Sequence, residues 1–261
     1  MLTANKYLDR SVRSLLYIGI MGQLAFAIYI MIHFGGTAIQ GDWQSWTESM
    51  IHGIIEGDPI GNLAVIIHIL LAFIITLGGP LQFFSWFRTK GSSFHKWNGR
   101  IYIVTALLIS FGALFMVWNR PATIGGELGR IAISGNGLLI IWFAIMTWRT
   151  AVQRKFEEHR KWAIRTFVVV SGVWFFRVGF GTWFLVTGFT APGVTEDLSG
   201  WFDRILYFGS YLVPLLISET YIRVKAANNI RAKWALAIFL FVLCPLLIGG
   251  TFITIKVFWL R

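Results

Sequence analysis

Three ionisable side chains fall inside apolar runs of the sequence: His68, Arg177 and Glu219. A charged or titratable group costs free energy in the hydrocarbon of a membrane, so such a residue is typical of a functional site. His33 closes the first apolar run at a depth similar to that of His68, which predicts an outer cluster of His33, His68 and Arg177 if their helices face one another. Arg177 lies too deep to reach the bilayer surface, so it requires an internal partner, a water cavity or an anionic ligand.

Two of these residues also have purely structural interpretations. His68 could make a hydrogen bond between helices, and Glu219 could pair with Arg223 one helical turn later.

Two further histidines stand in basic connections, in the segments FHKWNGR (94–100) and EHRKWAIR (158–165). A neutral imidazole binds haem iron or another metal, so His95 and His159 are the candidate metal ligands and could supply an axial pair. Arg100 and Arg165 each follow a tryptophan by three residues and therefore share its helical face, where they could reach propionates or phosphates. The alternatives are interfacial histidines and Trp–Arg pairs that only anchor the chain at the lipid headgroups.

The amino-acid composition indicates that membrane-spanning helices position these residues. The chain has 261 residues, of which 56% are hydrophobic and 13% charged, whereas soluble domains carry roughly 25% charged residues. This excludes a soluble globular enzyme and a disordered chain. Seven runs are long enough to cross a bilayer, which predicts an all-α, polytopic helical bundle: Val12–Phe34, Asn62–Phe87, Gly99–Trp118, Ile131–Ala151, Trp162–Gly188, Trp201–Ile222 and Trp234–Val257.

The net charge of +11 is sorted along this bundle. Most basic residues lie at the N-terminus and in the second, fourth and sixth connections, while most acids lie in the others. By the positive-inside rule the N-terminus is inside and the C-terminus outside, as in a multi-pass protein of the bacterial inner membrane. The lone Cys244 excludes an intrachain disulfide and a cysteine metal site.

The bundle is expected to be a single transmembrane domain, 1–261, with two internal features. The motif K-W-x-x-R occurs twice, which suggests duplicated hairpins at 62–119 and 131–188, although a short motif can also recur by chance. The long connection before the second span has apolar residues at helical spacing, which predicts an outer amphipathic helix at 43–56 that either covers the bundle or acts as a lid. Pro80 and the preceding glycines are expected to kink the second span.

The ordered motifs His68, GGPLQF (78–83), HKWNGRIY (95–102) and EHRKWAIR resemble those of an uncharacterised bacterial family of predicted integral membrane proteins. The resemblance covers the second to fifth spans and implies membership without an assigned activity. More remotely, hairpins that bear histidines are similar to the bundles of b-type cytochromes and ferric reductases, which implies haem. The chain departs from that pattern because it lacks the four histidines of a dihaem protein.

These observations favour a membrane redox protein that binds haem b or a quinone through His95, His159, His68, Arg100, Arg165 and Arg177. No catalytic residue is assigned. The alternatives are a non-catalytic subunit or lipid-binding scaffold, and a small transporter with Glu219 as its proton carrier. Expected partners are membrane lipids and other membrane subunits or further copies of the chain. A nucleic-acid partner is excluded because no basic soluble domain exists to hold one.

Overall fold

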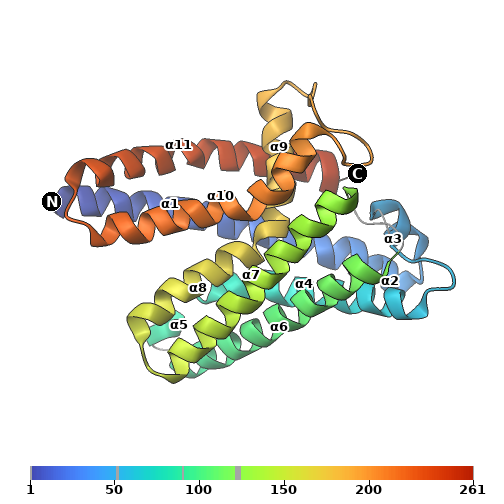
Figure 1. The fold of residues 1–261 in the computed structure, drawn as a ribbon, viewed down its shortest axis with the longest axis horizontal. Coiled ribbons are helices and arrows are strands. Elements are labelled where there is room, and N and C mark those ends of the chain that lie inside the picture. The colour runs from blue at the N-terminus through green and yellow to red at the C-terminus, as the bar shows by residue number, and fades with distance from the viewer. Residues whose placement is uncertain (1, 51–52, 90, 121–124, 261) are drawn as a thin grey trace.

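The protein is described by a computed structural model that places residues 2–50, 53–89, 91–120 and 125–260. Within these ranges every regular element is a helix, which confirms the all-α prediction (Figure 1). The elements are α1 (Leu2–Tyr29), η1 (Ile30–Gly35), α2 (Gly36–Gln40), α3 (Gln44–Ser49), α4 (Pro59–Leu81), α5 (Ser85–Thr89), α6 (Ser92–Asn119), α7 (Gly126–Val152), α8 (Phe156–Val170), α9 (Gly172–Val186), α10 (Trp201–Ala226), α11 (Ile230–Thr254) and η2 (Ile255–Trp259).

The helices give six candidate membrane spans, or seven if a bent pair counts as one. The first span is the continuous run of α1, η1 and α2. The bent pair is α8 and α9, whose axes differ by 55°. The seven-span expectation therefore holds when α8 and α9 cross the membrane together.

Figure 1 shows how the connections are distributed between the two ends of the bundle. The N-terminus, α5, the α7–α8 turn and the α10–α11 turn lie at one end, which we call the basic end because the four basic segments of the sequence lie there. The C-terminus, α2 and α3 lie at the opposite end. The sorting of charge is therefore a property of the fold, while the compartment that each end faces stays a prediction.

Two groups of helices pack side by side. α4, α6, α7 and α8 form one group through successive antiparallel contacts, and α1, α9 and α11 form the other, with α10 between them (Figure 1). In the second group α9 and α11 approach closely at Gly181 and Gly250, because a Cβ atom on Gly181 would lie 2.2 Å from the Gly250 carbonyl oxygen. Small residues permit such contacts between helices in membranes, where no hydrophobic force drives association.

The bend between α8 and α9 occurs at Ser171, deep in the bundle. The Ser171 hydroxyl donates to the Phe167 carbonyl at 2.7 Å and accepts from the Gln23 amide of α1 at 2.8 Å. Gly172 follows, and a Cβ atom there would lie 3.0 Å from the Asn136 amide nitrogen of α7. The bend is therefore stabilised by a polar contact from α1 and by the close approach of α7.

Replacing Ser171 with Ala should weaken this bend slightly. The Gln23 amide would lose its partner, at a cost of about 1 kcal/mol in the free energy of unfolding, which is typical of hydrogen bonds between membrane helices. Reversible unfolding of the purified protein in mixed micelles measures the change. The substitutions Gln23→Leu and Ser171→Ala should not be additive, because either one removes the same bond; additive losses would contradict the assignment.

Two helices are shorter than the sequence predicted. α4 ends at Leu81, so Pro80 lies in its last turn, whereas a kink inside a longer span was expected. The outer helix α3 covers only Gln44–Ser49, because the Thr47 side chain bonds to both the amide and the carbonyl of Ile54 and so folds the chain back on itself.

Candidate functional site

A cluster around Arg177 lies where α1, α4 and α9 meet. The Arg177 guanidinium lies 4.9 Å from the centre of the Phe26 ring, and its Nη1 donates to the Val173 carbonyl at 3.3 Å. Among the described residues no carboxylate lies within 4.0 Å of it. Arg177 therefore holds a positive charge against an aromatic ring with most of its five N–H donors unused.

Tyr29 and His68 complete this Arg177 cluster. Each lies close enough to Arg177 for electrostatic interaction with it. The Nδ1 atom of His68 is buried and has no hydrogen-bond partner among the described residues. Trp259 stacks on Phe26 and Tyr29 with ring centres 5.2 and 5.6 Å apart. The result is a guanidinium and an imidazole in an aromatic setting.

His33 lies at the edge of this cluster. Its ring stacks on Tyr29 at 5.3 Å between centres, and its Nε2 lies 2.6 Å from the Ser49 hydroxyl of α3. The structure thus brings His33, His68 and Arg177 into one region, with Tyr29 between them. Tyr29 carried no sequence signal, since a tyrosine near a span end also fits an interfacial belt.

His95 and His159 lie at the basic end, in the first turns of α6 and α8. The Nδ1 of His159 lies 3.0 Å from the Thr147 carbonyl oxygen, so it carries the proton and leaves Nε2 able to accept a ligand. The described residues contain no group of three or more His, Cys, Asp or Glu side chains suited to a metal ion. Axial ligation of haem needs only two histidines, so this pair stays a prediction.

The two K-W-x-x-R segments adopt the same local geometry. The Arg100 guanidinium lies 4.9 Å from the Trp97 ring centre, and the Arg165 guanidinium lies 4.5 Å from that of Trp162. Arg165 also forms a two-pronged ion pair with Glu219 of α10. The expected Glu219–Arg223 bridge is therefore wrong, because α8 packs against α10 and brings a closer cation. Glu219, the proton carrier of the transporter alternative, is therefore held in an ion pair with Arg165.

The opposite end carries a polar network that sequence reasoning missed. Arg120, whose side chain is 5% exposed, pairs with Asp58 at 3.1 Å. Its terminal nitrogens donate to the Gly53 carbonyl at 3.1 and 3.2 Å and to Asn62 at 3.0 Å. Asn62 in turn bonds to both backbone groups of Ile55. These contacts join segments that lie far apart in the sequence, so no local pattern reveals them.

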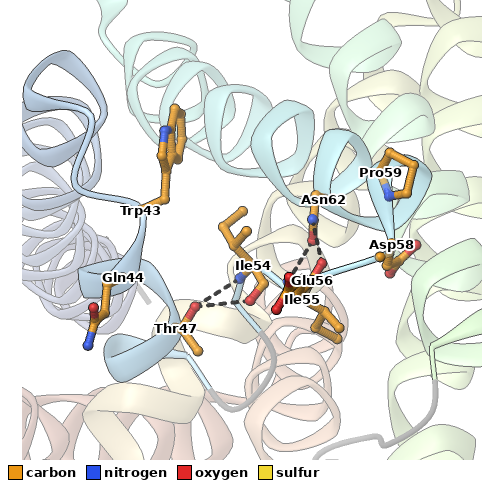
Figure 2. Close-up of a pocket in the computed structure, with 10 residues that line it drawn as sticks. Trp43, Gln44, Thr47, Ile54, Ile55, Glu56, Asp58, Pro59 and Asn62 are labelled. Carbon is orange, nitrogen blue, oxygen red and sulfur yellow. Dashed lines mark hydrogen bonds between the residues drawn. The ribbon is translucent and has the colours of Figure 1, made fainter.

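Figure 2 shows a hollow beside this network, between α3 and the start of α4. It has a volume of about 630 Å³ and opens widely to the surface. Trp43, Gln44 and Thr47 line one side, and Glu56 and Asn62 line the other. None of the six candidate cofactor-binding residues lines it, but most of its lining belongs to the segment 43–56 that was expected to cover the bundle or act as a lid.

Comparison with known families gives one match. A model of the predicted membrane protein family DUF2306 matches residues 65–222. The chain belongs to this family. Comparisons with curated proteins and with solved structures found no match.

The DUF2306 region runs from α4 into α10 and includes all six candidate site residues, His68, His95, Arg100, His159, Arg165 and Arg177. Tyr29 and Phe26 precede it, so α1 contributes to the Arg177 cluster from outside the family match.

Within the DUF2306 region, the motif GGPLQF contacts both HKWNGRIY and Phe167, which lies on α8 two residues after EHRKWAIR. Asn98 of HKWNGRIY donates to the Gly78 carbonyl at 2.9 Å, which satisfies an acceptor near the end of α4. A Cβ atom on Gly79 would lie 3.0 Å from the Tyr102 ring and 3.1 Å from Phe167. Phe83 and Phe167 pack with ring centres 4.6 Å apart. These contacts join α4, α6 and α8, which gives GGPLQF and HKWNGRIY a packing role whatever else they do.

Proposed function

We propose that this DUF2306 protein is a redox protein of the bacterial inner membrane that binds a quinone head group at the Arg177 cluster. The observation that carries the proposal is the Arg177 guanidinium, which has no carboxylate partner among the described residues and faces Phe26. A guanidinium placed this way requires an acceptor, and a quinone supplies two carbonyl oxygens.

The surroundings of Arg177 also suit a quinone. His68 offers a second hydrogen-bonding group on the facing helix α4, and the mutually stacked rings of Tyr29 and Trp259 form an aromatic wall beside it. Arg177 and His68 each keep a small exposed surface, and a ligand from the bilayer would have to reach them there. The positive charge of Arg177 stabilises electron density on the carbonyl oxygens, which favours the reduced forms of such a ligand.

To test this proposal, the full chain is purified in detergent and its bound quinones are extracted and quantified. We expect bound quinone in the wild type and about tenfold less in Arg177→Gln and His68→Leu, since one charge-assisted hydrogen bond supplies roughly this much affinity. Lys256→Gln, an exposed cation of the same half of the bundle, serves as the matched control and should retain the quinone. Equal quinone content in all variants with unchanged melting temperatures would refute the site.

The haem b version of the redox hypothesis uses His95 and His159 and has its own test. Its support is the free Nε2 of His159 at the basic end, where cations suit the haem propionates. The absorption spectrum of the purified protein should show a Soret band that either His→Leu substitution abolishes. A wild-type protein without such a band would exclude haem while leaving the quinone proposal intact.

A further inference from the structure

The two K-W-x-x-R segments differ in what satisfies their arginines. In the α8 copy, Glu219 binds the guanidinium that lies over Trp162, and the Arg165 side chain is 16% exposed. In the α6 copy, Arg100 is exposed, and no described carboxylate lies within 4.0 Å of it. The α8 copy shows that the guanidinium of an Arg held over a Trp in this geometry donates to a carboxylate. In the α6 copy, the same N–H donors of Arg100 are exposed.

We propose that Arg100 and Trp97 bind the headgroup phosphate of an anionic phospholipid, which takes the place that Glu219 has in the other copy. The phosphate oxygens would accept two N–H bonds from the guanidinium, as a carboxylate does. Trp97 is 63% exposed, and an exposed indole at a membrane boundary lies at headgroup level. The stacking holds Arg100 in one orientation before the lipid arrives, which lowers the entropy cost of binding.

An apolar stripe on α6 favours a lipid over a free phosphate. From Trp97, exposed apolar side chains continue along one face of the helix at spacings of three and four residues: Ile101, Val104, Leu108, Phe111 and Phe115. Acyl chains attached to a phosphate at Arg100 would lie along this face. A free phosphate gains nothing from it.

The charge around Arg100 favours an anionic lipid over a zwitterionic one. Lys96, also exposed, lies one turn earlier on α6, and the described residues place no ion pair on either cation. A zwitterionic headgroup would bring its own cation toward these two.

The test is lipid retention by the full chain in native mass spectrometry, with phosphatidylglycerol and phosphatidylcholine supplied in equal amounts. We expect the wild type to retain phosphatidylglycerol preferentially and Arg100→Gln to bind it about tenfold more weakly. Arg160→Gln is the matched control, because it removes an exposed arginine from the same end of the bundle without an aromatic ring beneath it. Equal loss in Arg100→Gln and Arg160→Gln would overturn the proposal, since it would reflect net charge alone.

Two further experiments test the role of the Trp97 ring and the choice of a lipid over a free phosphate. Trp97→Leu keeps the charge but removes the ring, so it should weaken phosphatidylglycerol retention by several fold, and unchanged retention would overturn the role of the stacked pair. Excess inorganic phosphate should not displace the lipid, because it lacks the chains that lie on α6; complete displacement would overturn the choice of a lipid. Neither experiment depends on whether a quinone binds at the Arg177 cluster.

Discussion

Arg120→Gln is expected to lower the free energy of unfolding by about 1–3 kcal/mol, the cost of leaving a buried acceptor without its donor. The side chain of Arg120 is 5% exposed and joins Asp58, Gly53 and Asn62. A glutamine cannot reach all three, so the buried Gly53 carbonyl and the half-buried Asp58 carboxylate would be left with fewer donors. The connection that carries α3 would then detach from the ends of α4 and α6.

Thermal unfolding followed by tryptophan fluorescence measures the loss, and limited proteolysis between α3 and α4 reports where it occurs. Arg204→Gln is the control, because Arg204 is exposed near the same end and its loss should have little effect. Faster cleavage in Arg120→Gln alone is the expected result. An Arg120→Gln protein as stable as Arg204→Gln would show that the network does not hold the connection.

Gly181→Val is expected to separate α9 from α11. The new Cβ would lie 2.2 Å from the Gly250 carbonyl oxygen and 2.3 Å from the Thr254 hydroxyl, and backbone cannot yield as a flexible side chain does. Overpacking of this kind costs about 1–3 kcal/mol or more. The Thr254 hydroxyl also donates to the Arg177 carbonyl at 3.1 Å, so the shift would displace the Arg177 cluster.

Gly209→Val tests whether crowding, and not the valine itself, causes the loss. A Cβ atom at Gly209 meets nothing within 4 Å, although it too lies inside a membrane helix. Gly181→Val should therefore melt at a lower temperature and lose bound quinone, whereas Gly209→Val should do neither. Similar losses in both would attribute the effect to helix propensity.

The spans, and the end of the bundle at which each connection lies, could be read from the sequence because they depend on local composition. Runs such as Trp201–Ile222 are long and apolar, and sorting the cations then places alternate connections at one end. The bend at Ser171 could not be predicted in this way. Serine and glycine are ordinary in membrane helices, and what bends this one are the contacts from Gln23 and Asn136, which come from other helices.

In the candidate site, too, some residues could be predicted from the sequence, whereas the contacts between helices could not. His68 and Arg177 stood out because ionisable residues are rare in spans, but their setting depends on Phe26 and Tyr29 of α1, which look like ordinary core residues. Glu219 is the clearest case in which the sequence does not identify an ion-pair partner. Its nearest cation in the sequence is Arg223, yet its partner is Arg165 on a neighbouring helix, a choice that only the packing of α8 against α10 determines.

The bend between α8 and α9 also bears on how the chain enters the membrane during synthesis. Each half has 15 residues and so extends about 22 Å, short of the roughly 30 Å of a bilayer core. Neither half can serve alone as a stop for the translocation machinery. We expect this span to settle only once α7 precedes it and α10 follows, which makes its insertion a cooperative event among neighbours.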